Sequence, residues 1–171
     1  MLPRLGAKEA TKETQRIYCV ELVNKAITVF RRTDALYKLP LFPGFGGKVA
    51  RILIADDRES MRIALKTLFV LRPDWEICGE AEDGRDAISK ATDLRPDMIV
   101  LDFKMPLANG LQAAQEICKN LPTTPIVMYT LYKNDQLESV ARSAGVRRVV
   151  AKEDGVQSLL GAIEAELAAE K

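Results

Sequence analysis

The sequence predicts an α/β fold: a three-layer sandwich built on a five-stranded parallel sheet of order 2-1-3-4-5. Two patterns favour it. From residue 51 onward, short apolar runs alternate with stretches whose apolar residues repeat at helical spacing. Each helical stretch is long enough to cross over between parallel neighbours, which takes about a dozen residues or more. In addition, residues capable of chemistry follow four of the apolar runs.

The first half of this pattern contains three expected strands. Arg51–Asp57 reads as a buried strand, and the helical repeat that follows stops at Pro73, which lacks an amide donor. Glu76–Ala81 alternates polar with small or apolar residues, as an outer strand with one wetter face would, and Arg85–Leu94 is a weaker helix. Met98–Leu101 is entirely apolar, which fits a central strand covered by helices on both faces.

The second half repeats the alternation. Asn109 is a favourable N-cap for the third helix. Ile126–Tyr129 is the fourth strand, and Gly145 ends the helix that follows it. Val149–Ala151 is the fifth strand, and an apolar stripe within Val156–Leu167 marks the last helix.

Charge divides the chain near residue 48. Residues 1–48 hold nine Lys and Arg against four Asp and Glu (+5), whereas residues 49–171 have a net charge of −4. The segment 39–47 is rich in Pro and Gly, which interrupt regular structure. We therefore expect an N-terminal extension over residues 1–48 and a folded domain over residues 49–171.

The extension contains an apolar stripe at helical spacing, which predicts an amphipathic helix: Ile17, Val20, Val23, Ile27 and Phe30. Such a helix could dock on the domain or self-associate, and its positive charge could attract nucleic acid or an acidic partner. Two alternatives stay open. The extension could be poorly ordered, or translation could begin at Val49.

Composition excludes several classes of function. The chain has no histidine, which removes Ser-His triads and any phosphohistidine carrier role. Its three cysteines have no Cys-x-x-Cys spacing, so disulfide frameworks and zinc sites are disfavoured. The longest apolar stretches fall far short of the ~20 residues of a membrane-spanning helix, and no secretory signal is apparent. We expect a cytoplasmic protein without a membrane partner.

The candidate site gathers five residues at the C-terminal ends of expected strands: Asp56, Asp57, Asp102, Thr130 and Lys152. All strand C-termini of an open parallel sheet face one edge, so these side chains should converge there. Crowded carboxylates attract a cation, and oxygen-only ligands favour Mg²⁺. A carboxylate beside Mg²⁺ can act as a nucleophile toward phosphorus, and an ammonium and a hydroxyl can stabilise the transferred group.

Each residue also has a plain structural explanation. An acidic pair after a strand is more often a solvated turn, a threonine there more often caps a helix, and a lysine beside acids is more often surface charge. All these explanations would have to hold together, in order, at successive strand ends. The combination therefore favours a site.

The order acidic pair, single Asp, Thr, Lys, with Met105-Pro106 and Gly110 after Asp102, resembles the receiver domain of two-component response regulators. The resemblance runs from about Val49 to Ala168. It implies a flavodoxin-like (βα)5 fold and a Mg²⁺-dependent phosphorelay function.

The resemblance also assigns roles to individual residues. Asp102 is the expected phosphoacceptor, and Thr130 and Lys152 are expected to contact the bound phosphoryl group. The resemblance implies that Asp57, Asp102 and the Lys104 backbone carbonyl bind the metal directly and that Asp56 binds it through water. Arg62, five residues after Asp57, also fits the pattern.

Three positions depart from the pattern. Val149 stands where an aromatic switch residue is usual, Leu131 where a small residue is usual, and Glu153 where proline is frequent. Lys152-Glu153-Asp154 is similar to receivers that precede helix-turn-helix domains, but only nineteen residues follow Lys152. We therefore expect no downstream effector domain and no direct nucleic-acid binding by the α/β unit.

The expected function is signal transduction, with Asp102 phosphorylated by a sensor histidine kinase or a phosphotransfer protein. Phosphorylation would change a partner surface over roughly Leu137–Leu160, and a homodimer is one expected outcome. The domain would not be an enzyme beyond promoting its own phosphorylation and dephosphorylation. Two alternatives stay open: a constitutive interaction module that has lost switching, and a hydrolase with an aspartate nucleophile and magnesium.

Overall fold

The structure is a computed structural model that describes residues 49–169. Its centre is a parallel sheet of order β2-β1-β3-β4-β5, as the sequence predicts. The strands are β1 (Ala50–Ala55), β2 (Trp75–Ala81), β3 (Met98–Leu101), β4 (Ile126–Thr130) and β5 (Arg148–Ala151). The extension over residues 1–48, with its expected amphipathic helix, lies outside the described residues.

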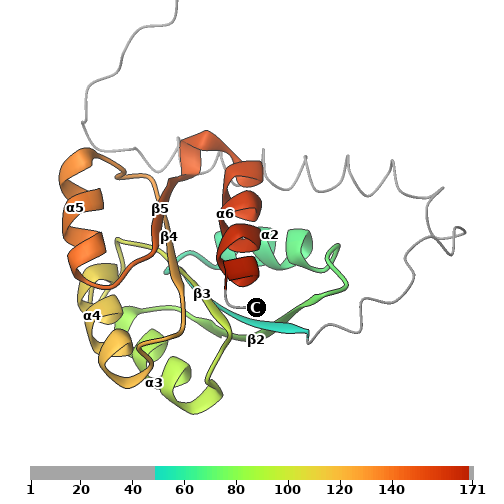
Figure 1. The fold of residues 1–171 in the computed structure, drawn as a ribbon, viewed down its shortest axis with the longest axis horizontal. Helices are drawn as coiled ribbons and strands as arrows, with labels where there is room; N and C mark the ends of the chain where they lie inside the picture. The colour runs from blue at the N-terminus through green and yellow to red at the C-terminus, as the bar shows by residue number, and fades with distance from the viewer. Residues whose placement is uncertain (1–48, 170–171) are drawn as a thin grey trace, which may run out of the picture.

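A helix follows each strand, and the helices cover both faces of the sheet (Figure 1). They are α2 (Glu59–Phe69), α3 (Gly84–Leu94), α4 (Gly110–Asn120), α5 (Asp135–Ser143) and α6 (Val156–Ala169), with one 3-10 turn at Lys152–Asp154. Helices α2 and α6 pack in one hydrophobic cluster, and α3, α4 and α5 pack in the other. The three-layer sandwich is confirmed.

Strand alternation supplies the two cores. In β1, Ile52 and Ile54 enter the cluster under α2 and α6, whereas Leu53 and Ala55 enter the opposite cluster. Strand β3 is buried along its whole length between β1 and β4, which its apolar sequence predicts. This central position places the C-terminus of β3 beside that of β1.

Local side-chain contacts determine where several helices begin and end. Asn109 accepts a hydrogen bond from the Gln112 amide at 3.0 Å in a capping box, so the predicted N-cap of α4 is confirmed. Gly145 has φ +91° after α5, and the Gly145 and Val146 amides donate to the Arg142 and Ala141 carbonyls. This is a Schellman motif, which confirms Gly145 as the stop.

Several element boundaries differ from the sequence expectation. Strand β1 covers Ala50–Ala55 rather than Arg51–Asp57, so the acidic pair lies just after it. Helix α3 and strand β5 each begin one residue earlier than expected, and β4 extends one residue further, to Thr130. Helix α2 ends at Phe69, ahead of Pro73, because a hydrogen-bonded turn follows in which the Arg72 amide donates to the Phe69 carbonyl at 2.9 Å. Strand β2 begins at Trp75, one residue earlier than expected. Within residues 49–169, no helix is long and apolar enough to cross a membrane.

Candidate functional site

Four strand ends bring the predicted residues to one edge of the sheet. Asp56 and Asp57 follow β1, Asp102 follows β3, Thr130 is the last residue of β4, and Lys152 follows β5. The Asp102 amide donates to the Ala55 carbonyl at 2.8 Å, which fixes the end of β3 against the end of β1. The convergence predicted from the sequence is therefore present.

Three carboxylates form a compact acidic cluster. Asp56, Asp57 and Asp102 each place one oxygen within 4.8 Å of the others. Asp56 and Asp102 are buried, at 2% and 5% exposure, whereas 38% of the Asp57 side chain is exposed. The cluster is thus open to solvent at Asp57, whereas Asp56 and Asp102 are shielded from solvent.

Lys152 supplies a buried positive charge to this cluster. Its Nζ donates to Asp56 Oδ2 at 2.6 Å and lies 3.2 Å from Asp102 Oδ1, with 1% of the side chain exposed. The ammonium also lies 5.7 Å from the centroid of the Tyr129 ring, a cation–π contact. The attraction of the ammonium to these two carboxylates offsets the cost of removing it from water.

The acidic cluster shifts the ionisation of two of its members. Desolvation by burial raises the pKa of Asp102 to about 6, because the lowering effect of Lys152 does not fully offset it. Desolvation, with repulsion from Asp56, also raises the pKa of Asp57. Both shifts mean that negative charge is costly here, so a cation that entered the cluster would be stabilised.

The donor set fits a magnesium ion. Oxygen ligands from one or two carboxylates suit Mg²⁺, which keeps several of its waters. Asp102 Oδ1 is buried, and its charged neighbour is the Lys152 ammonium at 3.2 Å. Both oxygens of Asp56 already accept hydrogen bonds, Oδ1 from the Arg58 amide at 3.0 Å and Oδ2 from Lys152.

Thr130 ends β4, the strand beside β3, and Lys104 lies in the loop that follows β3. The Thr130 hydroxyl is buried and accepts a hydrogen bond from the Tyr132 amide at 3.2 Å. Lys104 follows Asp102 by two residues, and its Nζ lies 3.4 Å from the Tyr132 hydroxyl and 5.4 Å from the centre of its ring. Phe103 packs edge-on against Tyr132 at 6.2 Å. An aromatic and cationic rim therefore adjoins the acidic cluster.

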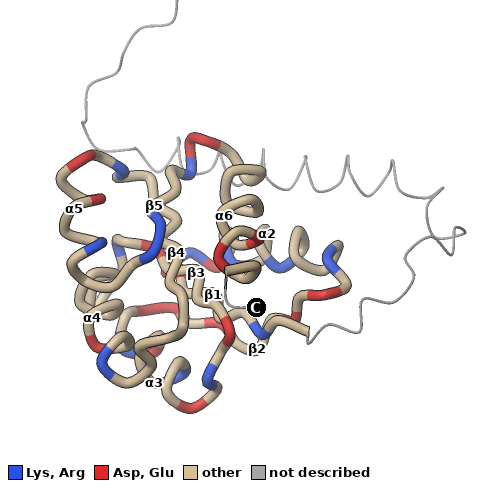
Figure 2. The backbone as a smooth tube through the Cα atoms, in the orientation of Figure 1, with Lys and Arg blue, Asp and Glu red and all other residues tan. Residues whose placement is uncertain are grey.

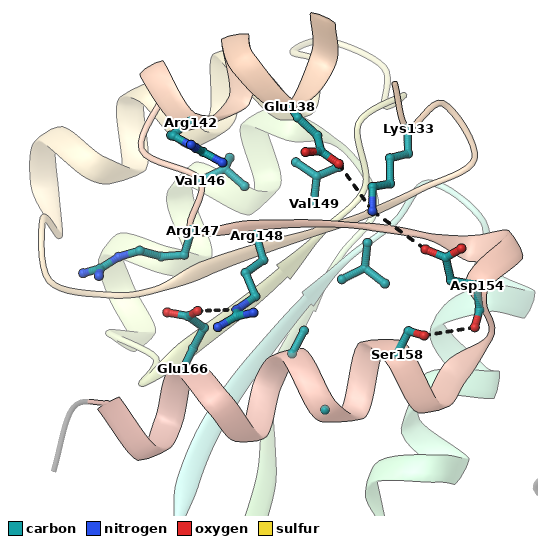
Figure 3. A pocket seen from close by; sticks show the side chains of 13 residues that line it. Lys133, Glu138, Arg142, Val146, Arg147, Arg148, Val149, Asp154, Ser158 and Glu166 are labelled. Atoms are coloured by element: carbon teal, nitrogen blue, oxygen red, sulfur yellow. Dashed lines mark hydrogen bonds and ion pairs between the residues drawn. The ribbon is translucent and has the colours of Figure 1, made fainter. Parts of the chain in front are cut away.

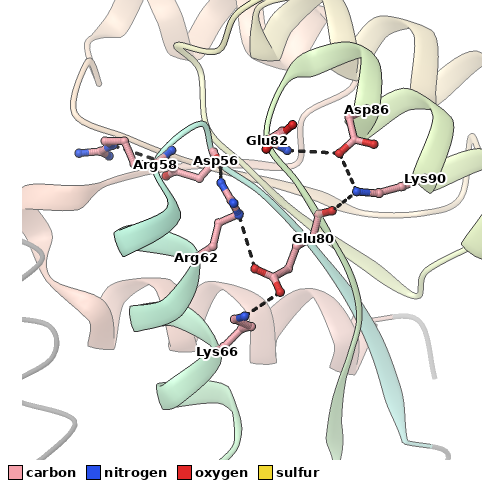
Figure 4. Close-up of polar contacts among 8 residues, drawn as sticks. All are labelled: Asp56, Arg58, Arg62, Lys66, Glu80, Glu82, Asp86 and Lys90. Atoms are coloured by element: carbon pink, nitrogen blue, oxygen red, sulfur yellow. Dashed lines mark hydrogen bonds and ion pairs between the residues drawn. The ribbon is translucent and has the colours of Figure 1, made fainter.

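Two arginines of the α2 segment also reach the cluster (Figure 4). Arg62 Nη1 donates to the Asp56 carbonyl at 2.8 Å, and its Nε lies 3.4 Å from Glu80 Oε2. Arg58 Nε lies 3.4 Å from Asp56 Oδ1 and 3.9 Å from Asp57 Oδ1. Sequence reasoning missed Arg58, and its place directly after the acidic pair is the feature that could have identified it.

The fold and the site together define a doubly wound α/β domain with an acidic cluster, suited to Mg²⁺, at its strand C-termini. The protein-family model described as the response regulator receiver domain matches residues 52–164 of this chain. The chain therefore belongs to the family of receiver domains of two-component response regulators. Domains of this family take part in phosphorelay signalling with histidine kinases or phosphotransfer proteins and bind Mg²⁺ at an acidic pocket.

Comparisons with individual proteins agree with this membership. The chain is 33% identical over 113 residues to the response regulator protein VraR of Staphylococcus saprophyticus, covering 66% of this chain and 54% of that protein. It is 29% identical over 113 residues to the transcriptional regulatory protein LnrK of Bacillus subtilis, covering 66% of this chain and 51% of that protein. The chain thus spans about half the length of these relatives.

Solved structures with the same fold include two receivers. The response regulator domain of Thermotoga maritima CheB has a TM-score of 0.66 at 30% identity, covering 71% of this chain and 98% of that one. A two-component response regulator of the LuxR family from Aurantimonas sp. SI85-9A1 has a TM-score of 0.68 at 29% identity, covering 71% of this chain and 87% of that one.

Proposed function

We propose that Asp102 accepts a phosphoryl group from a sensor histidine kinase or a phosphotransfer protein. An Asp102 oxygen attacks phosphorus, the bond from phosphorus to the donor histidine nitrogen breaks, and that nitrogen takes up a proton. The observation that carries this proposal is the position of Asp102 Oδ1, which is buried beside the other two carboxylates of the acidic cluster and lies 3.2 Å from the Lys152 ammonium. The oxygen that would react is therefore held beside positive charge.

The metal ligands of the proposal are Asp57, Asp102 and the Lys104 backbone carbonyl, with Asp56 acting through water. The exposure of Asp57 supports a direct role, because a hydrated ion can reach it from solvent. The two hydrogen bonds that Asp56 already accepts support an indirect one. When bound, Mg²⁺ would neutralise charge that develops on the transferred phosphoryl oxygens.

Lys152 and Thr130 would hold the phosphoryl group once it is on Asp102. The ammonium can pair with one phosphoryl oxygen, and the hydroxyl can donate to another while its own oxygen accepts from Tyr132. The group adds about −1.5 to −2 charges, which would draw Lys152 away from Asp56 and shift the adjoining loops. The domain would promote only its own phosphorylation and dephosphorylation.

The surface that would respond to phosphorylation lies between α5 and α6, over β5. It includes residues 137–160 and the residues next to them. A hollow of about 460 Å³ lies there, and Figure 3 shows Val149 and Val146 among the charged side chains that line it. Lys133 pairs with Glu138 at 3.3 Å and with Asp154 at 3.8 Å at one end of the hollow. Figure 2 shows basic residues on α5 and β5. A protein partner or a second copy of the chain could dock there.

Incubation with acetyl phosphate and Mg²⁺, followed by intact-mass measurement, tests the proposal. The wild type should gain one phosphoryl group, and Asp102→Asn should gain none. No labelling of the wild type would favour the constitutive module, and steady release of phosphate without a labelled protein would favour the hydrolase. Binding of a kinase or an output partner, compared between the two proteins under phosphorylating conditions, then tests switching.

A further inference from the structure

Arg58 occupies an unusual place beside the acidic cluster. It is the residue between the acidic pair and α2, and its side chain turns back so that Nε faces Oδ1 of both Asp56 and Asp57, at 3.4 and 3.9 Å. Only 19% of this side chain is exposed. Figure 4 shows Arg58 and Arg62 approaching Asp56.

The two arginines differ in how firmly they are held. Arg62 donates to the Asp56 carbonyl at 2.8 Å and pairs with Glu80, which Lys66 also contacts at 2.7 Å. The side chain of Arg58 has ion pairs but no such anchor, and its Nη1 is buried without a hydrogen-bond partner among the described residues. The Nε of Arg62 also lacks a hydrogen bond there, but it faces Glu80 Oε2 at 3.4 Å. A buried donor without a partner is costly, so the Arg58 guanidinium gains hydrogen bonds when it moves into water.

A cation that enters the acidic cluster meets the charge of Arg58. Asp56, Asp57 and Asp102 contribute three carboxyl groups, and the side chains of Lys152 and Arg58 place two positive charges against them. Lys152 is buried and contacts Asp56 and Asp102, whereas Arg58 lies on the exposed Asp57 side through which a hydrated ion would arrive. Like charges at this range repel, so an entering cation and the Arg58 guanidinium cannot both lie against the Asp56–Asp57 pair without a cost in free energy.

We propose that Arg58 is a built-in counter-ion that competes with Mg²⁺ for the Asp56–Asp57 pair. Without metal, its guanidinium reduces the repulsion between the two carboxylates. Metal binding displaces it toward solvent, which weakens the apparent affinity for Mg²⁺ and makes the metal-loaded state depend on Mg²⁺ concentration. This inference rests on the magnesium site of the proposed function, and it assigns Arg58 a role in tuning that site.

Calorimetric titration with MgCl₂ tests the competition directly. Arg58→Gln should tighten Mg²⁺ binding roughly tenfold, because an adjacent and partly buried ion pair no longer has to be broken. Arg58→Lys retains the charge and should bind Mg²⁺ close to the wild-type affinity. Arg85→Gln is the matched control: it removes an exposed arginine from the first turn of α3, at the same edge of the sheet, and should change the affinity less than about twofold.

Thermal unfolding supplies a second readout. In EDTA, Arg58→Gln should unfold at a lower temperature than the wild type, and saturating Mg²⁺ should raise its midpoint by more than it raises the wild-type midpoint. Arg58→Met, which keeps an apolar stem, provides a second variant in case the glutamine folds poorly. Both variants should show a lower unfolding midpoint than the wild type in EDTA and a larger rise of that midpoint on addition of Mg²⁺.

The possible failures are distinguishable. Unchanged or weaker Mg²⁺ binding by Arg58→Gln and Arg58→Met, with binding still lost in Asp57→Asn, would overturn the role of Arg58 and leave the magnesium site standing. If Arg85→Gln tightened Mg²⁺ binding as much as Arg58→Gln does, the change in affinity would be explained by net charge alone. That result would also overturn the proposed role of Arg58. Absence of Mg²⁺ binding by both the wild type and Arg58→Gln would overturn the inference together with the proposed metal site.

Discussion

The shortest polar contact of Lys152 is with Asp56: its Nζ lies 2.6 Å from Asp56 Oδ2 and 3.2 Å from Asp102 Oδ1. The two residues are 96 positions apart and follow strands β5 and β1, which are separated in the sheet by β4 and β3. The lysine side chain therefore ties the edge strand to the acidic cluster. Before any phosphoryl group arrives, it acts as the buried counter-charge of Asp56.

Lys152→Met should destabilise the domain by about 3 kcal/mol, because removing one partner leaves buried carboxylates without their counter-charge. Urea unfolding at pH 7 in EDTA measures this loss. Mg²⁺ should restore part of it, since a divalent cation supplies positive charge to the same carboxylates.

The matched control is Lys133→Met. Lys133 makes its ion pairs with Glu138 and Asp154 at the surface, with 34% of its side chain exposed, so its removal should cost less than about 1 kcal/mol. Equal losses for the two variants, or no effect of Mg²⁺ on Lys152→Met, would contradict the assignment of Lys152 as the counter-charge of the cluster.

Asp102→Asn should stabilise the metal-free domain at pH 7.5, by on the order of 1–3 kcal/mol. Burial raises the folded-state pKa of Asp102 from 3.8 to about 6, so the folded domain binds this proton more tightly than the unfolded chain. The stabilising effect of that proton is fully present below about pH 4 and is lost as the pH rises through about 6. The advantage of the asparagine should therefore shrink on acidification.

Urea unfolding in EDTA from pH 4.5 to 7.5 measures that advantage. Asp93→Asn, at an exposed position of α3, is the control and should change stability by no more than about 0.5 kcal/mol across the range. A constant difference between Asp102→Asn and the wild type would mean that Asp102 does not titrate in this range.

Much of the fold could be predicted because local patterns and the sheet rules agree. The apolar run Met98–Leu101 predicted a central strand, and Asn109 and Gly145 predicted helix ends that the structure confirms. The convergence of Asp102 and Lys152 followed from the shared edge of strand C-termini. These inferences needed only short-range patterning and a parallel topology.

Side-chain trajectories could not be predicted in the same way. The spacing of Arg58 from the acidic pair does not reveal that its side chain turns back over Asp56 and Asp57, because an arginine side chain has many rotamers. The contact of Lys104 Nζ with the Tyr132 hydroxyl depends likewise on the relative placement of two loops. Asn134, which caps α5 through the Leu137 amide at 2.8 Å, was a sequence feature that could have been used.

Gly110→Ala should destabilise the domain by about 2 kcal/mol or more and impair phosphorylation. A Cβ at residue 110 would meet backbone atoms, the Asp102 carbonyl oxygen and the Phe103 Cα, inside normal contact distance. The backbone that carries Asp102 would have to move. Thermal unfolding and acetyl phosphate labelling measure the two effects.

Gly161→Ala provides the opposite case within the same chain. A Cβ there meets nothing within 4 Å, and residue 161 lies inside α6, so alanine should stabilise the domain by about 0.5–1 kcal/mol through its helix propensity. Labelling should be unchanged. If both alanines destabilised equally, steric contact at Asp102 would not be the reason for glycine at residue 110.

Leu131→Ala should shorten the lifetime of phosphorylated Asp102 roughly threefold, which corresponds to about 0.6 kcal/mol of barrier. Leu131 is half-buried and directly follows Thr130, whose hydroxyl would contact the phosphoryl group, so its bulk should restrict the approach of water. Loss of the label after removal of acetyl phosphate, at constant Mg²⁺, gives the rate. Val140→Ala, at an exposed apolar position of α5, is the control and should leave the rate unchanged. Equal rates for Leu131→Ala and the wild type would show that this side chain does not limit access of water to the phosphoryl group.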